Sequence, residues 1–282
     1  MPLWKRLLCV VLLVLLPVCA LAEDEEISLW DIGIIIDDAA SYDDVPWNFP
    51  IDLMDMEPEL VRLANKEIFL PEDFVPDDLV TMKSRKTDKE GNNTNGGVKK
   101  ASSGEMQLQR ECAEALVQMM EDALDQGITL YLKSAYRSYR TQKTMYYNRL
   151  EKNNGYDDGW VTKPGASDHQ TGLGCDVVPP GWTDRGMNED MAKEDGCIWM
   201  AENCHYYGFI IRYPSDKEDV TQINYEPWHL RYVGIPAATY IMENGLCLEE
   251  FQEELQGAID EFLANGGRYS LVDDFIINTE EE

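Results

Sequence analysis

The chain has 282 residues and a formal net charge of −29 at pH 7. A field of this sign repels nucleic acids and anionic lipid surfaces, which argues against both as partners, although it identifies no substrate. The length is sufficient for one good-sized domain with extensions at its ends.

Residues 1–22 have the features of an export signal. Lys5 and Arg6 form a basic start, an almost purely apolar run follows over 7–18, and residues 20–22 (ALA) provide a small-x-small cleavage site. The apolar run is shorter than the ~20 residues that span a bilayer comfortably, so cleavage is favoured over a retained membrane anchor. We therefore expect an extracytoplasmic protein, secreted or associated with the cell envelope, that contacts a membrane only if this segment is retained.

Composition divides the remaining chain into three parts. Residues 23–57 form an acidic N-terminal extension without a clear period, 58–265 a single folded domain, and 266–282 a C-terminal tail. Within the domain, residues 83–104 are rich in Lys, Asn, Gly and Ser. This composition predicts a flexible loop.

Apolar spacing and turn signals predict the elements of the domain. The predicted helices cover 108–123, 141–152, 190–207, 236–245 and 248–262. The predicted strands cover 128–133, 175–178, 209–213 and 229–233. Because helices and strands mix without a regular βαβ order, we predict an α+β fold with a small antiparallel sheet flanked by helices.

Five cysteines follow the export signal, and none of them has the CxxC spacing of a zinc knuckle. They are Cys112, Cys175, Cys197, Cys204 and Cys247. An odd number leaves at least one unpaired in a monomer. Cysteine chemistry is therefore not expected at the centre of this protein.

Two of the three histidines lie in unusually specific surroundings. His169 belongs to the segment SDHQTGLGCD, which ends at Asp176, and His229 ends the segment EPWH. Two imidazoles and one carboxylate form a sound catalytic zinc set, because three protein ligands leave the fourth position to water. The glycines at 172 and 174 allow the sharp turn that brings His169 and Asp176 together. We therefore predict one zinc ion per chain, held on the predicted sheet by His169, Asp176 and His229.

The residue that best suits a general base is Glu226, three residues before His229. Pro227 argues against a shared helix interior, so we expect Glu226 to end a loop and His229 to begin a strand. Arg137 supplies a cation whose planar guanidinium can hold oxygen atoms in a fixed fork. It closely follows the strand predicted over 128–133, so we expect sheet pairing to hold its Cα. Gln142 can reach the same cleft from the start of the next helix.

Each of these residues taken alone also has a plain structural interpretation. A single histidine near an apolar run is usually a structural residue, and we apply this interpretation to His205. An arginine before a turn is usually a surface charge. Cys175 neighbours Asp176, but adjacent side chains on a strand face opposite ways, so Cys175 should point into the core. Only the combination of His-x6-Asp, Glu-x-x-His and Tyr-Arg indicates a metal hydrolase.

Long segments of the chain resemble one family of metallopeptidases. They are LPEDFVPDDLV at 70–80, YRSYRTQ at 136–142, SDHQTGLGCD at 167–176, YGFIIRYP at 207–214 and YEPWHLRYVG at 225–234. From about Leu60 to Glu250 the sequence is similar to the VanY-type D-alanyl-D-alanine carboxypeptidases, in the group that contains VanX dipeptidases and lysostaphin-like enzymes.

The resemblance implies zinc on the predicted ligand set, Glu226 as the base and Arg137 as the group that stabilises the transition state. It also implies that Ser167 and Gln142 contact the substrate. The family commonly has Glu where this chain has Asp168, and Ala where it has Cys175. Neither position is a ligand, so these departures leave the zinc set intact.

The activity implied is a zinc-dependent carboxypeptidase that removes the terminal D-Ala from peptidoglycan stem peptides, as a monomer, by Glu-assisted attack of a zinc-bound water. An alternative is an L,D-carboxypeptidase that acts on tetrapeptide stems with the same machinery. A catalytically silent binding domain, as in hedgehog-like modules, is disfavoured because Glu226 and Arg137 accompany a full ligand set. Endopeptidase action requires a cleft open at both ends.

Overall fold

The computed structural model describes residues 45–277. By its contacts the chain divides into two units, Met1–Asp44 and Val45–Glu282, and the described residues belong to the second. The predicted export signal therefore lies outside the described residues, as does most of the acidic extension. Among residues 45–277, no helix combines the length and the apolar character needed to cross a membrane.

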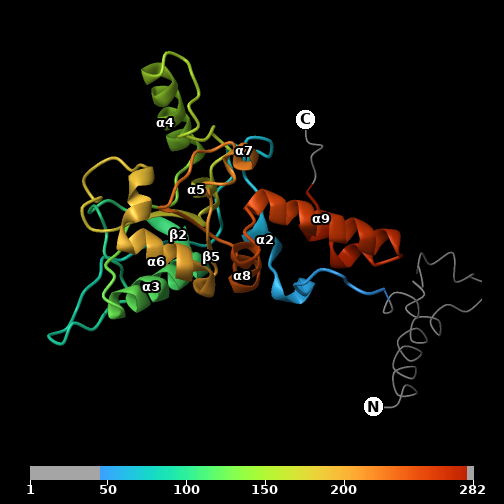
Figure 1. Cartoon of the computed structure of the whole chain (residues 1–282), viewed down its shortest axis with the longest axis horizontal. Coiled ribbons are helices and arrows are strands. Elements are labelled where there is room, and N and C mark those ends of the chain that lie inside the picture. Colours follow the sequence, from blue (N-terminus) through green and yellow to red (C-terminus); the bar gives the residue numbers. More distant parts are fainter. Residues whose placement is uncertain (1–44, 278–282) are drawn as a thin grey trace, which may run out of the picture. The chain divides into compact units, whose positions relative to one another are not determined.

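A four-stranded antiparallel sheet forms the centre of the fold (Figure 1). Its strands, in spatial order, are β3 (Tyr131–Ser134), β4 (Gly174–Val178), β6 (His229–Tyr232) and β5 (Phe209–Ile211). The two central strands are buried along their whole length. Their register pairs Asp176 with His229, so residues 53 positions apart become direct neighbours across the sheet.

Helix α3 (Arg110–Asp125) covers the sheet with an apolar face that includes Cys112, Leu116 and Met119. Gly127, with φ of +84°, ends this helical segment, because only glycine adopts such a backbone without strain. Helix α6 (Asp195–Asn203) belongs to the same core through Trp199 and Met200. The site-forming helices are α4 (Tyr139–Lys152) and the short α5 (Asp168–Thr171).

A second hydrophobic cluster surrounds α8 (Ile235–Glu243) and α9 (Leu248–Ala264). Residues from both ends of the described chain belong to it, among them Phe49 before the predicted domain and Phe275 after it. The remaining elements are short: η3 (Leu53–Asp55), α2 (Pro58–Val61), β1 (Leu79–Thr81), β2 (Gln107–Gln109), η4 (Glu189–Lys193), η5 (Cys204–Tyr207), α7 (Glu218–Thr221), η6 (Tyr269–Leu271) and η7 (Asp273–Phe275).

The α+β class with a small antiparallel sheet is confirmed, and the differences from prediction lie at element boundaries. The helix predicted over 190–207 is interrupted, because Glu194 has an extended backbone (ψ 139°) between η4 and α6. Leu108 shares the helical spacing of α3 but lies on β2, which pairs with β1. Residues 83–104 form isolated bridges such as Thr87 with Asn93, and Arg85 there binds Glu121 on α3 at 2.6 Å.

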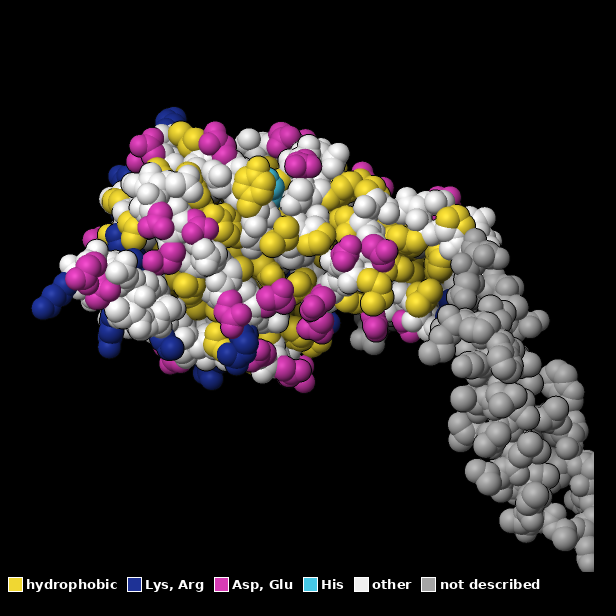
Figure 2. All heavy atoms as spheres, turned by 90° about the horizontal axis from the view of Figure 1, so that it is seen from below, with side chains coloured by type: hydrophobic (Ala, Val, Ile, Leu, Met, Phe, Trp, Pro, Cys, Tyr) yellow, Lys and Arg dark blue, Asp and Glu magenta, His cyan; other side chains and the backbone are white. Residues whose placement is uncertain are grey.

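Acidic side chains are spread over the face of the described part seen in Figure 2, whereas basic side chains gather mainly toward one end. The abundance of acidic side chains on this face reflects the 53 acidic and 24 basic residues of the chain. The acidic part of this face repels polyanions.

Candidate active site

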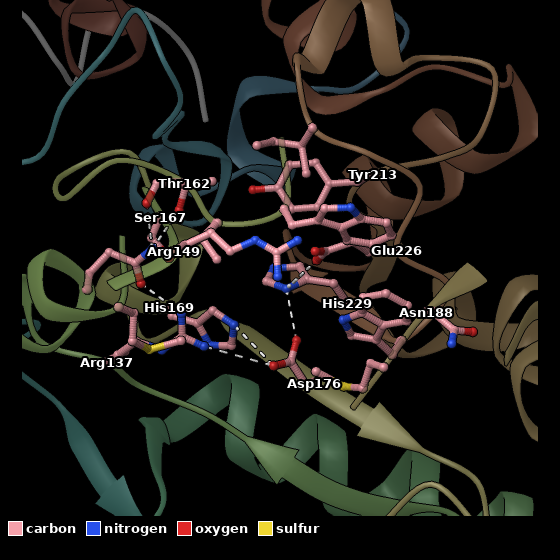
Figure 3. A pocket seen from close by; sticks show the side chains of 17 residues that line it. Arg137, Arg149, Thr162, Ser167, His169, Asp176, Asn188, Tyr213, Glu226 and His229 are labelled. Carbon is pink, nitrogen blue, oxygen red and sulfur yellow. Dashed lines mark hydrogen bonds and ion pairs between the residues drawn. The ribbon is translucent and has the colours of Figure 1, made fainter. Parts of the chain in front are cut away.

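Three potential metal ligands converge at the two central strands of the sheet. His169 lies on α5, Asp176 on β4 and His229 at the start of β6, and one ligand atom from each lies within 4.8 Å of the others. Figure 3 shows the three side chains directed toward one another. All three are buried.

Two glycines bring α5 against β4. Gly172 ends α5 in the left-handed conformation (φ +71°) and turns the chain toward the strand. Gly174 begins β4 so close to α5 that an added Cβ would lie 2.9 Å from Asp168. Any larger residue at 174 would push α5 away from β4, and with it His169 away from Asp176.

The protonation of the His169 imidazole suits metal binding. Nδ1 of His169 lies 2.7 Å from the Ala135 carbonyl oxygen, so Nδ1 carries the proton and donates it there, and the unprotonated Nε2 lies on the side of Asp176, 3.5 Å from Oδ2. Burial and then the positive charge of Arg137 lower the pKa of His169 to about 4. The imidazole is therefore neutral near pH 7, as a metal ligand must be.

His229 faces Asp176 with Nδ1, whereas His169 faces it with Nε2. The His229 Nδ1 atom lies 3.0 Å from Asp176 Oδ1. Ligand atoms ~2.0–2.2 Å from a tetrahedral ion lie roughly 3.3–3.6 Å apart. The separations of 3.0 and 3.5 Å between the carboxylate and the two imidazoles are close to this range. Two imidazole nitrogens and one carboxylate therefore fit a catalytic metal ion with a position left for a further ligand.

Glu226 lies beside this set in the turn that leads into β6. Its N–H donates to the Tyr213 carbonyl oxygen at 3.0 Å, and its own carbonyl oxygen accepts from the N–H of His229 at 3.1 Å. The turn places its Oε2 3.6 Å from His229 Nδ1. Burial and then the negative charge of Asp176 raise the pKa of the Glu226 carboxyl, while Arg137 acts in the opposite direction. The loop position expected for Glu226 and the strand start expected for His229 are both observed.

Arg137 lies three residues beyond β3, so sheet pairing does not hold it as expected. Its N–H donates to the His169 carbonyl oxygen at 3.0 Å instead. Its guanidinium donates to Gln142 Oε1 at 2.7 Å and to Ser134 Oγ at 3.2 Å, and Nη2 lies 4.0 Å from Asp176 Oδ2. The arginine is therefore fixed to α5 and α4, and its charge faces the ligand set.

The two residues for which substrate contact is predicted both line the pocket. The Gln142 amide is engaged within the protein, because its Nε2 donates to the Thr162 carbonyl oxygen at 2.7 Å and its Oε1 accepts from Arg137. Ser167 occupies the N-cap position of α5 without a capping hydrogen bond from its side chain. Gln142 thus holds Arg137 in place, and direct substrate contact by either residue stays a prediction.

The pocket in front of these groups has a volume of about 460 Å³. The pocket is also lined by residues that were not predicted from the sequence, among them Arg149, Trp160, Asn188 and Tyr213. Tyr213 lies in the YGFIIRYP segment, so that string was a usable signal for it. Trp160, which stacks on Trp228 at 6.1 Å, and Asn188 come from irregular segments without any pattern.

The residues assigned structural roles lie elsewhere. His205 is buried on η5 against the Tyr206 ring, with 4.0 Å between centroids, and is not part of the metal set. Cys175 is fully buried in the core, as predicted. All five cysteines in the described part of the chain are free thiols.

Comparison with known proteins assigns the family. A model described as VanY, D-alanyl-D-alanine carboxypeptidase, matches residues 105–235. A putative carboxypeptidase of Bacillus subtilis (strain 168), YodJ, is 37% identical over 198 residues, which is 70% of this chain and 68% of that protein. The chain belongs to the VanY D-alanyl-D-alanine carboxypeptidase family. A VanY-family enzyme with this ligand set is a metallo-carboxypeptidase, as predicted.

Other relatives agree with this assignment. A D-alanyl-D-alanine carboxypeptidase of Enterococcus faecalis is 38% identical over 146 residues, 48% of this chain and 52% of that protein. Among solved structures, the LdcB LD-carboxypeptidase is 36% identical with a TM-score of 0.60, over 70% of this chain and 87% of that one. A vancomycin-resistance D,D-pentapeptidase VanY in complex with Zn(II) is 28% identical with a TM-score of 0.51, over 68% and 98%.

Proposed function

We propose that the protein is an exported, zinc-dependent D-alanyl-D-alanine carboxypeptidase that removes the terminal D-Ala from peptidoglycan stem peptides. The observation that carries the hydrolysis of a peptide bond is the convergence of the metal set, Glu226 and Arg137 on one pocket of about 460 Å³, and the similarity to D-alanyl-D-alanine carboxypeptidases supports the D,D specificity. Each of these groups has a distinct task in the hydrolysis of a peptide bond.

Zinc would be held by His169 Nε2, the Asp176 carboxylate and His229 Nδ1, the three atoms directed at a common point. When bound, the ion supplies Lewis-acid chemistry, because it polarises a carbonyl and lowers the pKa of water toward ~7. That VanY relatives were crystallised with Zn(II), and in another case with D-Ala-D-Ala, supports both the metal and the ligand class.

Glu226 is placed to take the proton of the attacking water and to pass it to the amine of the departing D-Ala. Its carboxylate borders the metal set at 3.6 Å from His229 without belonging to it. Because burial raises its pKa, the carboxyl can hold a proton between the two transfers.

Arg137 is placed to stabilise the negative charge that develops on the carbonyl oxygen of the substrate. Its bonds to Gln142 and Ser134 orient the guanidinium and engage only part of its five N–H groups. A cation held in position before the reaction stabilises the transition state without reorganisation.

A second candidate is an L,D-carboxypeptidase that removes D-Ala from a tetrapeptide stem. It is favoured by the similarity to the LdcB LD-carboxypeptidase, which at 36% identity exceeds the 28% of the VanY structures compared above. Both activities release D-Ala and differ only in the residue that precedes it. The metal set, Glu226 and Arg137 serve both equally.

The two activities are separated by incubation of the purified protein with synthetic stem pentapeptide and tetrapeptide, followed by mass spectrometry. We expect the pentapeptide to lose one alanine and the tetrapeptide to remain. Faster loss from the tetrapeptide would assign the L,D activity, and no loss from either peptide by zinc-loaded protein would refute the proposal.

Export is supported by the basic and apolar pattern of residues 1–22, because the stem peptides lie outside the cytoplasm. Cell fractionation followed by N-terminal sequencing is the test. We expect an extracytoplasmic protein whose first residue is Glu23. An intact N-terminus in the membrane fraction would indicate an anchor instead.

A further inference from the structure

A buried charge cluster lies behind the metal site. It consists of Asp168, Arg212, Arg231 and Glu249, and the side chains of the first three have no exposed surface. Two carboxylates balance two guanidinium groups, so the cluster is neutral as a whole. Glu249 belongs to α9, outside residues 105–235 that the family model matches.

Both oxygens of the Asp168 carboxylate are held by arginines. Arg212 donates from Nε to Oδ2 at 2.6 Å, and Arg231 donates from Nη1 to Oδ1. Arg212 is held in turn by Glu249 through two bonds of 2.7 Å. Arg231 also donates to the carbonyl oxygen of Leu60 at 3.0 Å. This arrangement fixes the place of the carboxylate and keeps it ionised.

The imidazole of His229 has one nitrogen on the side of the metal set and the other on the side of the Asp168 carboxylate. His229 presents Nδ1 to the metal set, and a neutral imidazole that does so must carry its proton on Nε2. Nε2 is buried and has no hydrogen-bond partner among the described residues. The Asp168 Oδ2 atom lies 4.0 Å away, roughly 1 Å beyond a normal N–H···O bond.

We propose that Asp168 is the positioning residue of the metal site: it accepts the Nε2 proton of His229 and thereby holds Nδ1 toward the ion. The inference rests on the proposed function, because it requires a metal at Nδ1. Carboxylates commonly orient metal-bound histidines in this way. Asp168 itself is buried and acts only through His229.

The test compares the zinc affinities of Asp168→Asn and Glu249→Gln by competition with a chelator. The two variants form a matched pair, because each neutralises one carboxylate that binds the same guanidinium, Arg212. We expect Asp168→Asn, whose neutral amide is a weaker acceptor than the carboxylate, to weaken zinc binding roughly 10–100-fold, the usual effect of substituting such a partner, and Glu249→Gln to stay within about threefold of the parent. Equal affinities in both variants and the parent, or equal losses in both, would overturn the inference in favour of a purely structural role.

A measurement on the unsubstituted protein covers the case in which Asp168→Asn does not fold. The chain has only three histidines, so ¹⁵N NMR of the zinc-loaded protein can assign each ring. We expect metal at Nδ1 of His229 and a proton at Nε2 that exchanges slowly with water. Metal at Nε2, or a rapidly exchanging Nε2 proton, would overturn the inference.

A zinc titration of the parent protein distinguishes a failure of the proposed function from a failure of the positioning role of Asp168. A parent that binds no zinc refutes the proposed function, and the role of Asp168 falls with it. A parent that binds zinc and loses no affinity on Asp168→Asn refutes the positioning role alone.

Discussion

Replacing Arg137 by alanine is expected to lower kcat far more than it raises KM. The guanidinium donates to Gln142 and Ser134, and the backbone N–H of Arg137 donates to α5, so the side chain is oriented before any substrate arrives. Negative charge on the substrate carbonyl oxygen is largest in the transition state. A preoriented cation therefore acts mainly on the barrier.

The expected decrease in kcat follows from the loss of a charged donor to the carbonyl oxygen of the substrate. Removal of one donor to a developing oxyanion costs roughly 10²–10³ in kcat, or about 2.7–4 kcal/mol. Arg137→Lys keeps the charge but loses the planar fork that donates to both Gln142 and Ser134. We expect the lysine variant to recover only part of the rate.

Steady-state kinetics on a peptide that ends in D-Ala-D-Ala measures both parameters. Arg140→Ala is the matched control, because Arg140 lies only three residues further along the chain, on α4, and is exposed outside the pocket. Its kinetics should stay near those of the parent. If Arg137→Ala raises KM and leaves kcat unchanged, Arg137 binds the terminal carboxylate of the substrate and the catalytic argument is refuted.

Three further changes test the remaining parts of the site. Glu226→Gln should keep zinc and fold but lose ~10²–10⁴-fold in turnover, since only proton transfer is removed; a rate within a few-fold of the parent would require another base. His169→Ala and His229→Ala should each lose stoichiometric zinc in metal analysis, and retention by both would contradict the ligand set. Gly174→Ala places a Cβ 2.9 Å from atoms of α5 and should destabilise by ~1–3 kcal/mol in thermal unfolding, whereas Gly257→Ala on α9, with open space around it, should not.

Much of the site was predictable because its residues lie in short segments whose backbone is dictated locally. Gly172 and Gly174 allow the turn between His169 and Asp176, and Pro227 disfavours a helix interior shared by Glu226 and His229. The predicted ligand set and the predicted base therefore follow from local chemistry, and the structure places these residues together. Apolar spacing likewise predicted the α+β class and the positions of most helices.

Element boundaries were less predictable, since pairing partners decide where an element begins. The strand predicted over 128–133 is observed as Tyr131–Ser134, where β3 pairs with β4. Leu108 fits the helical spacing of apolar residues but lies on β2, because this segment pairs with β1. The spacing of apolar residues indicates which face of a segment is buried, but it does not indicate which neighbouring element covers that face.

Only the tertiary structure decided how distant segments complete the site. The pairing of β4 with β6 sets Asp176 beside His229, and backbone and side-chain hydrogen bonds, not sheet pairing, fix Arg137. The cluster of Asp168 with Arg212 and Glu249 joins residues 44 and 37 positions apart along the chain. Such contacts depend on long-range packing of helices against the sheet. A local pattern of residue types contains no record of that packing, so the charges behind His229 became visible only in the folded protein.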